Sequence, residues 1–322
     1  MKILITGGLG FIGSNLATEL SKRNHDIILL DNLDPRYGGN RFNIFDSKSK
    51  NINVVEDSVL NNKLLKELVK DTDLVIHTAA QVSYIDSFKI IRKEIDLNIK
   101  ATINILEAIK ANGCKAKLVF TSSRMVYGKL TKKIIHESND KNPVSIYGIT
   151  KLTSENLIKS YANEYNIKFL IIRITNPYGI KQQIKHSKYS IVGWFIRCAM
   201  EDKEIHIYGD GQQKRNYIFS KDLIDCIVSL INNKASNNQI LNLGSDYNVS
   251  FSTMVQTVIK VVGSGRVKYV EWPEDYEKIE TSSFNVSIDL LKNILGKIQF
   301  TSLEEGIRKS KEYYKKYWDN YV

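Results

Sequence analysis

The sequence predicts an α/β protein built on a doubly wound parallel sheet, with a smaller mixed α/β region after it. An apolar run over residues 2–6 passes straight into a glycine-rich turn at residues 7–13, and helical periodicity follows. Short apolar runs then alternate with amphipathic segments as far as about residue 178. Parallel strands need crossover connections, usually helices, so this alternation favours a sheet with helices on both faces. After residue 178 the rhythm stops at an irregular basic segment.

Each element follows from the same periodicity. The expected strands are residues 2–6, 26–30, 53–57, 74–80, 117–121 and 169–173, and the expected helices between them are about 14–20, 64–69, 94–111 and 147–165. Further helices are expected at about 191–200, 221–231 and 307–318. The predicted domains are residues 1–178 plus about 216–245, which bind a dinucleotide, and about 179–215 plus 246–322, which bind the substrate.

The composition is that of a globular protein. The chain has 322 residues, of which 43% are hydrophobic and 25% charged. No apolar run approaches the roughly 20 residues that span a bilayer, and residues 1–5 predict a first strand rather than a signal peptide. The three cysteines, Cys114, Cys198 and Cys226, lack Cys-x-x-Cys spacing. They predict a cytoplasmic location and argue against a disulfide framework or a bound metal.

The net charge of +11 is spread along the chain, and lysines often alternate with acids, as in residues 63–67. We interpret this charge as solvated surface, with a few basic residues serving a phosphate-bearing ligand. No nucleic-acid-binding motif is visible. We expect neither nucleic acid nor a membrane as a partner.

The glycine turn predicts a dinucleotide site. Gly7 permits a tight turn, Gly10 lets the backbone approach a pyrophosphate, and Gly13 lets helix and strand pack closely, with Phe11 and Ile12 between them. The second strand ends in Asp31, where a carboxylate is expected to accept hydrogen bonds from the adenosine ribose. Because a carboxylate also repels a 2′-phosphate, the sequence favours NAD over NADP.

A tyrosine and a lysine four residues apart, Tyr147 and Lys151, form the candidate catalytic pair. Residues at this spacing share one face of a helix, so the ammonium can lie near the phenol and favour its ionised form. A tyrosinate beside an oxidising cofactor can take a proton from an alcohol while the cofactor takes the hydride. His77 could be named as a base instead, but we interpret it as a packing residue at a strand end.

The chain resembles the extended short-chain dehydrogenase/reductases, in their NAD-dependent nucleotide-sugar epimerase and dehydratase branch (UDP-glucose 4-epimerase-like proteins). The resemblance covers nearly the whole chain. It is carried by the glycine turn and the segments 77–81, 122–128, 147–151, 176–179 and 215–218 with Asp222, in this order and spacing.

The resemblance implies roles for individual residues. Ser123 would bond the sugar hydroxyl, Tyr147 would be the acid/base, and Lys151 would hold the nicotinamide ribose and lower the pKa of Tyr147. A larger group would surround the NAD cofactor, and it comprises Gly7, Gly10, Phe11, Ile12, Gly13, Asp31, Asn32, Asp57, Ser58, Ala79, Ala80, Gln81, Asn98 and Thr121. Asn176 and Arg215 would hold the substrate, a nucleotide-diphosphate sugar, on its diphosphate side. The helices 94–111 and 147–165 are the family's usual dimer surface, so a homodimer is expected.

Family members first oxidise the sugar at C4 to a 4-keto intermediate. The resemblance implies that a 4,6-dehydratase then needs an acidic pair directly after the serine or threonine, where this chain has Arg124 and Met125. A 4,6-dehydratase must remove the C5 proton of the sugar and expel the C6 hydroxyl, and neither side chain can supply or remove a proton for this. We therefore predict an epimerase acting at C4. A 4,6-dehydratase, a 2-epimerase and a C4 dehydrogenase-reductase of surface-polysaccharide biosynthesis remain as alternatives.

Three departures from the family pattern concern the substrate. A late segment that often carries an arginine over the nucleotide is acidic here, at residues 274–280. An acid that is usual near Ser287 in the family is missing. The position after Gln81 is occupied by Val82 and not by a basic residue. The sequence therefore leaves the sugar open.

Overall fold

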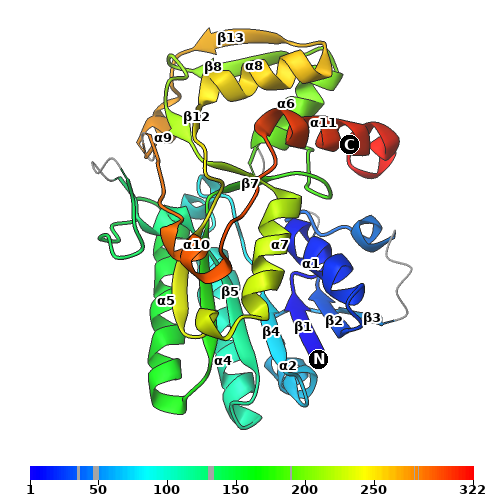
Figure 1. Cartoon of the computed structure of the whole chain (residues 1–322), viewed down its shortest axis with the longest axis vertical. Coiled ribbons are helices and arrows are strands. Elements are labelled where there is room, and N and C mark those ends of the chain that lie inside the picture. The colour runs from blue at the N-terminus through cyan, green and yellow to red at the C-terminus, as the bar shows by residue number, and fades with distance from the viewer. Residues whose placement is uncertain (35–36, 46–50, 130–133, 189–190, 279, 282) are drawn as a thin grey trace. The chain divides into compact units, whose positions relative to one another are not determined.

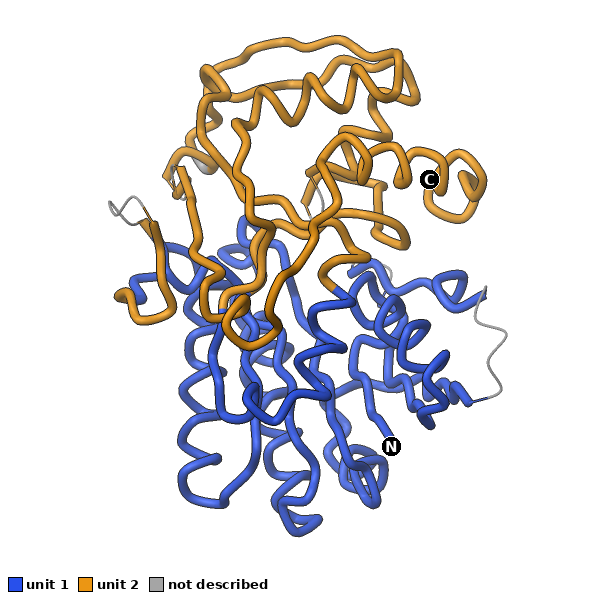
Figure 2. The backbone as a smooth tube through the Cα atoms, in the orientation of Figure 1, with its two compact units in different colours: residues 1–128, 141–173, 224–241 blue, residues 129–140, 174–223, 242–322 orange. Residues whose placement is uncertain are grey.

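The computed structural model describes residues 1–34, 37–45, 51–129, 134–188, 191–278, 280–281 and 283–322. They form two compact units, which Figure 2 colours separately. Unit 1 comprises residues 1–128, 141–173 and 224–241, and unit 2 comprises residues 129–140, 174–223 and 242–322. The assignment of one domain to a dinucleotide and the other to a substrate stays a prediction.

A seven-stranded sheet organises unit 1 (Figure 1), in the order β11-β6-β5-β4-β1-β2-β3. Strand β1 pairs in parallel with both β2 and β4. The chain thus builds outward from β1 to β3 and then returns to the other side of β1. Such a reversal opens a crevice at the carboxyl ends of the strands, where ligands of these folds bind. The strands are β1 (Lys2–Thr6), β2 (Asp26–Asp31), β3 (Ile52–Glu56), β4 (Leu74–His77), β5 (Lys117–Ser123), β6 (Phe169–Ile174) and β11 (Gln239–Leu243).

Helices of unit 1 cover this sheet. Helix α1 packs against β1 and β2, whereas α4 packs against both α2 and α5. Fully buried apolar side chains of strands and helices, among them Leu4, Val75 and Ile105, form one core that fixes the strand ends. The elements are α1 (Phe11–Ser21), α2 (Asn62–Val69), α3 (Ile91–Glu94), η3 (Ile95–Lys100), α4 (Ala101–Ala111), α5 (Ile146–Tyr165) and α7 (Ser220–Ile231), with short turns η1 (Arg41–Ile44), η2 (Asp86–Phe88), η4 (Arg124–Val126) and η5 (Lys234–Ser236).

The predicted parallel sheet and its alternation with helices are confirmed, with three local corrections. The expected helix 94–111 begins at Ile91 and is interrupted by the π-helical η3, a wider turn that periodicity does not reveal. The strand expected at 74–80 ends at His77, because the backbone of Ala79 lies against Gly7 instead of continuing the sheet. Strand β11 joins the sheet beyond the six strands that were expected.

Unit 2 contains short strand pairs and a cluster of helices. Strand β7 pairs with β10, β8 with β13, and β9 with β12, while α6, α8 and α11 pack together. Ser250 and Ser302 begin α8 and α11 by accepting hydrogen bonds from backbone N–H groups. The elements are β7 (Asn176–Tyr178), α6 (Ile191–Met200), β8 (Glu204–Tyr208), β9 (Lys214–Arg215), β10 (Tyr217–Phe219), β12 (Val249–Ser250), α8 (Phe251–Val262), β13 (Arg266–Val270), α9 (Glu274–Glu277), α10 (Asp289–Leu295), α11 (Leu303–Lys316) and η6 (Trp318–Asn320).

Across the part of the chain that the structure describes, every helix is too short or too polar to traverse a bilayer.

Candidate active site

The glycine turn between β1 and α1 is closely packed. Gly7 has a φ of +67°, in the left-handed region that favours glycine, and its N–H donates to Leu30 O at 2.8 Å. A Cβ on Gly7 would lie 2.7 Å from the Ala79 nitrogen, and a Cβ on Gly13 would lie 2.3 Å from the Gly7 oxygen. The turn therefore needs glycine at both positions.

The same turn presents the N-terminus of α1. Gly10 is the N-cap residue, and no side chain caps this helix in the described structure. The first N–H groups of a helix and the positive end of its dipole attract phosphate. Because no side chain occupies these N–H groups in the described structure, the N-terminus of α1 fits the pyrophosphate of a dinucleotide.

Alanine substitutions at Gly13 and Gly10 should behave differently. Gly13→Ala forces a Cβ against backbone, so we expect a loss of about 1–3 kcal/mol in the free energy of unfolding. The Cβ of Gly10→Ala would lie 3.2 Å from the Gly7 oxygen. That variant should stay folded but bind NAD more weakly, because a methyl group then stands where the pyrophosphate approaches. Denaturant unfolding and NAD calorimetry measure the two effects, and equal stabilities would contradict this account of Gly13.

Asp31 is held at the end of β2, beside the turn. Its Oδ2 accepts from Leu9 N at 3.0 Å and its Oδ1 from Leu33 N at 2.9 Å. Burial raises the pKa of Asp31, and these two hydrogen bonds oppose the shift. The carboxylate thus ties the turn to β2. Its contact with the adenosine ribose stays a prediction.

The other residues predicted near the adenosine lie in turns. Asn32 is exposed, and its Oδ1 accepts from Asp34 N at 3.3 Å. Asp57 Oδ2 accepts from Asn61 Nδ2 at 2.9 Å, and Asn61 in turn caps α2. Ser58 Oγ accepts from Leu60 N at 3.1 Å. These contacts shape the ends of β2 and β3, and a role in binding adenosine remains a prediction.

Asn98 shapes the loop that follows β4. Its Oδ1 accepts from Gln81 N at 3.0 Å, and its Nδ2 donates to Gln81 O at 3.3 Å. The Gln81 side chain folds back on its own loop and donates to Ser83 O at 2.9 Å. Both amide groups therefore hold the backbone around Ala79 and Ala80. The predicted lining of the cofactor would come from that backbone.

Helix α5 brings Tyr147 and Lys151 to the end of β5, where Ser123 lies. Ser145 caps this helix by accepting from Gly148 N at 3.1 Å, which places Tyr147 in the first turn. Lys151 Nζ donates to Thr121 O at 3.0 Å and lies 5.9 Å from the centre of the Tyr147 ring. Ser123 hydrogen-bonds the Tyr147 side chain. The three predicted catalytic residues thus lie together in unit 1, with Thr121 beside them.

The surroundings of Tyr147 shift its pKa in opposing directions. Burial raises it to about 12, the Ser123 hydrogen bond lowers it, the Glu94 carboxylate raises it, and the Arg124 charge lowers it. Burial also lowers the pKa of Lys151 to about 8. The predicted lowering of the Tyr147 pKa by Lys151 stays a prediction.

His77 is a packing residue, as predicted. Its ring is buried, with Nδ1 2.8 Å from Thr6 Oγ1 and Nε2 3.4 Å from Thr102 Oγ1. Burial lowers its pKa to about 3, and the nearby Lys151 charge adds to this. The neutral imidazole of His77 on β4 thus lies between the hydroxyl groups of Thr6 on β1 and Thr102 on α4, and it holds these three elements together.

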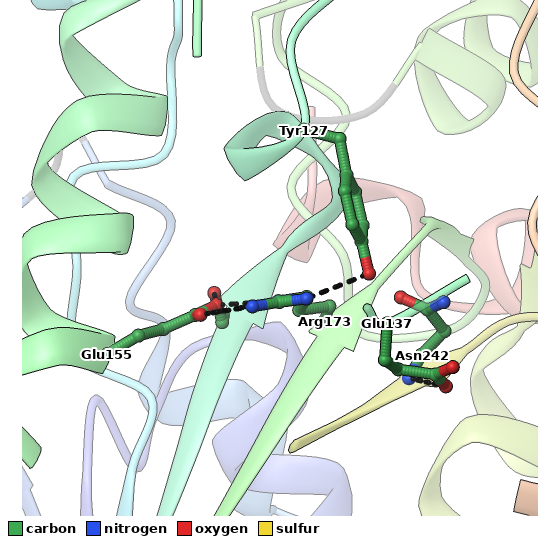
Figure 3. A network of polar contacts seen from close by, with 6 residues as sticks. Tyr127, Glu137, Glu155, Arg173 and Asn242 are labelled. Carbon is green, nitrogen blue, oxygen red and sulfur yellow. Dashed lines mark hydrogen bonds and ion pairs between the residues drawn. The ribbon is translucent and has the colours of Figure 1, made fainter. Parts of the chain in front are cut away.

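A buried ion pair between β6 and α5 was not predicted (Figure 3). Arg173 Nη2 donates to Glu155 Oε2 at 2.7 Å, and Arg173 Nη1 donates to the Tyr127 hydroxyl at 2.9 Å. Ser122 Oγ donates to Glu155 Oε1 at 2.5 Å. Ser122 and Tyr127 flank Ser123 in the chain, so this network holds the segment that carries Ser123. The sequence signals were Glu155, one turn after Lys151, and Arg173 at the end of the apolar run 169–173.

Asn176 and Arg215, predicted to hold the substrate, both lie in unit 2. Asn176 Nδ2 donates to Asn216 O at 2.8 Å, and the short strands β7 and β9 position the two residues. Arg215 is buried, donates from Nη1 to Lys214 O at 2.9 Å and forms an ion pair with Glu280. The acidic late segment thus supplies a partner for the arginine. Its role towards a diphosphate remains a prediction.

The comparisons with known proteins agree with this geometry. The family described as "NAD dependent epimerase/dehydratase family" matches residues 3–244. A Methanocaldococcus jannaschii protein, provisionally assigned as a UDP-glucose 4-epimerase, is 32% identical over 95% of this chain and 96% of its own. The UDP-N-acetyl-alpha-D-glucosaminuronate decarboxylase of Bacillus cytotoxicus is 29% identical over 98% of both chains.

Among solved structures, the UDP-glucuronic acid 4-epimerase of Bacillus cereus, in complex with UDP-glucuronic acid and NAD, superposes with a TM-score of 0.87. It is 26% identical, and the match covers 98% of this chain and 100% of that one. The match to the family model and the shared fold agree, whereas the roles of Ser123, Tyr147 and Lys151 stay predictions. The chain belongs to the NAD dependent epimerase/dehydratase family.

Proposed function

We propose that this protein is an NAD-dependent nucleotide-sugar epimerase that inverts C4 of a nucleotide-diphosphate hexose through a transient 4-keto sugar. The carrying observation is the grouping of Ser123, Tyr147 and Lys151 at the carboxyl end of β5, with Arg124 following Ser123. Arg124 lowers the pKa of Tyr147, so this position supports the base and offers no carboxylate for removing the C5 proton. This favours epimerisation over 4,6-dehydration.

In the proposed mechanism, NAD held at the glycine turn of Gly7, Gly10 and Gly13 would supply the acceptor, and later the donor, of the C4 hydride. Ser123 bonds the C4 hydroxyl, and Tyr147 takes the hydroxyl proton and later gives it back. Lys151, fixed by Thr121 O, supplies the positive charge that favours the tyrosinate. The 4-keto sugar would rotate in the site between the two hydride transfers. The hydride would then return to the opposite face of the sugar.

A panel of UDP-, GDP-, CDP- and dTDP-sugars tests this proposal. Each is incubated with the enzyme and NAD, and the products are identified by NMR. We expect one nucleotide sugar to reach equilibrium with its C4 epimer without stoichiometric consumption of NAD. A 4-keto-6-deoxy product, a decarboxylated pentose or net consumption of the cofactor would contradict the epimerase assignment. Each would assign the activity of another member of the family.

We also propose a homodimer formed through the helices around α5. Three isoleucines of α3, η3 and α5 expose large apolar surface, with Ile91 47%, Ile95 43% and Ile149 45% exposed. Ile91 and Ile95 are four residues apart on one helical face, and α3 packs against α5. A second copy of the chain would remove this surface from water.

A double variant, Ile95→Glu with Ile149→Glu, should shift the protein from dimer to monomer in sedimentation at micromolar concentration, because two carboxylates would be buried at the interface. Tyr269→Glu is the control, since Tyr269 is 53% exposed but lies in unit 2. The control should remain a dimer. A wild-type monomer would exclude the proposal.

The three cysteines carry free thiols, with Cys198 and Cys226 buried. Together with a nucleotide cofactor, these thiols support a cytoplasmic location as part of the proposal.

A further inference from the structure

Arg215 and Glu280 form an ion pair inside unit 2 that the proposed mechanism does not use. Their side chains are only 8% and 25% exposed, and Arg215 Nη2 donates to Glu280 Oε1. The arginine is the residue predicted to hold a diphosphate, whereas the glutamate ends the acidic segment 274–280. Guanidinium groups bind carboxylates and phosphates through the same planar fork of N–H donors. The Glu280 carboxylate therefore occupies a donor that an anionic ligand of Arg215 would need.

The arginine is held in place from several sides. It lies in β9, where it pairs with Val249 of β12, and its Nη1 donates to Lys214 O at 2.9 Å. Next to it, Asn216 O accepts from Asn176 Nδ2 at 2.8 Å, which joins the two residues predicted to hold the diphosphate. A buried guanidinium is costly to leave without an anion. Arg215 thus requires a counter-charge whether or not a ligand is bound.

The segment that carries Glu280 is attached to β9 independently of the ion pair. Phe284 N donates to Lys214 O at 3.0 Å, and Lys214 N donates to Ser283 Oγ at 3.1 Å. These two hydrogen bonds hold the backbone after Glu280 beside Arg215. The carboxylate therefore leaves the guanidinium by a turn of its partly exposed side chain towards water, while the backbone after it stays in place.

Other glutamates of the same segment lie at the surface. Glu274 pairs with Lys278 at 2.5 Å, and both side chains are exposed. Glu277 is exposed as well. The negative charge of Glu280 differs from these because it meets a buried cation, so its removal is expected to have effects that removal of an exposed charge does not have.

We propose that Glu280 is an internal competitor for the anionic ligand of Arg215, and that the diphosphate of a nucleotide displaces it. Without ligand, the carboxylate neutralises the guanidinium. With ligand, the carboxylate and the diphosphate would repel each other beside one guanidinium, so the carboxylate turns away. Glu280 therefore weakens the binding of a nucleoside diphosphate and stabilises the ligand-free protein. The class of ligand in this inference rests on the proposed function, whereas the ion pair does not.

Calorimetric titration of the protein with UDP, dTDP, GDP and CDP, in the presence of NAD, tests the competition. Glu280→Gln keeps the size of the side chain and removes its charge. The nucleoside diphosphate that binds the wild-type protein should bind this variant on the order of ten-fold more tightly, because no carboxylate opposes it. In the same variant, the midpoint of chemical denaturation without ligand should fall, because Arg215 loses its counter-charge.

These opposite changes separate a competitor from a residue that serves only the fold. Loss of a purely structural residue would lower stability and leave the affinity equal or weaker, and that result in Glu280→Gln would overturn the proposal. Glu277→Gln is the matched control, and its affinity should stay within about two-fold of wild type because water and salt screen an exposed charge. Equal tightening in both variants would count against Glu280, as would a wild-type protein and a variant that bind none of the four ligands.

A second variant applies if Glu280→Gln does not fold. Glu280→Asp keeps the charge but withdraws it from the guanidinium by one methylene group, so the affinity should rise by less than in Glu280→Gln. An unchanged or weaker affinity in Glu280→Asp would again overturn the proposal.

Failure of this inference and failure of the proposed function give different results. Tighter binding of a nucleoside diphosphate to Glu280→Gln, with no epimerised product from the sugar panel, would contradict only the proposed function. An active epimerase in which wild type and Glu280→Gln bind the nucleoside diphosphate equally would contradict only the role of Glu280.

Discussion

A Tyr147→Phe variant should lose roughly 10²–10⁴-fold in turnover while it keeps its fold and its affinity for NAD. In the proposed mechanism the Tyr147 phenol exchanges a proton with the sugar hydroxyl, while Lys151 Nζ donates to Thr121 O. The ring itself stays buried in the variant. Turnover is measured with the nucleotide sugar that the panel identifies, and NAD affinity by calorimetry.

Ser123→Ala is the matched comparison for this substitution. It removes the hydrogen bond that lowers the pKa of Tyr147 but keeps the phenol. We therefore expect a smaller loss in turnover than in Tyr147→Phe. A Tyr147→Phe enzyme that retains wild-type turnover would remove the tyrosine from the mechanism.

An Arg173→Met variant should lose about 3–5 kcal/mol in the free energy of unfolding, because it leaves the Glu155 carboxylate buried without its cation. The Tyr127 hydroxyl would lose the guanidinium donor at 2.9 Å as well. Since Ser122 and Tyr127 flank Ser123, turnover should fall together with stability. Chemical denaturation measures the first effect and the epimerase assay the second.

A surface ion pair offers the control for the buried one. Arg23 Nη2 lies 3.4 Å from Glu19 Oε1 on α1, and the Arg23 side chain is 42% exposed. Arg23→Met should cost less than about 1 kcal/mol, because water and salt screen exposed pairs. Adding Glu155→Gln to Arg173→Met should restore part of the lost stability. Similar losses in the free energy of unfolding for Arg23→Met and Arg173→Met would contradict the claim that burial makes the Arg173–Glu155 pair costly to break.

The elements that sequence predicted best are those set by local spacing. The strand, glycine turn and helix at residues 2–20 are contiguous, and Tyr147 and Lys151 lie one helical turn apart, so periodicity alone brings them together. The NAD cofactor followed from that local pattern, and the family match confirms it. Ser123 follows the predicted strand 117–121, and its role was implied by the family resemblance.

Interactions between distant residues were not predictable in this way. Arg173 meets Glu155 from the next strand, and Arg215 meets Glu280, which lies 65 residues further along the chain. Glu94 begins the amphipathic helix predicted over residues 94–111, and the structure shows that it is buried and that its carboxyl group accepts from Thr150. Such contacts depend on packing between elements, which no local pattern specifies.

The central claim is that a hydride leaves the sugar at C4 and returns to the same carbon. A nucleotide sugar with deuterium at C4 tests it most directly, with the product followed by NMR. We predict that the C4 epimer keeps its deuterium at C4 and that, in heavy water, unlabelled substrate gains none from solvent. Loss of the C4 label, or solvent deuterium at C5 or C6 with loss of the C6 oxygen, would contradict it.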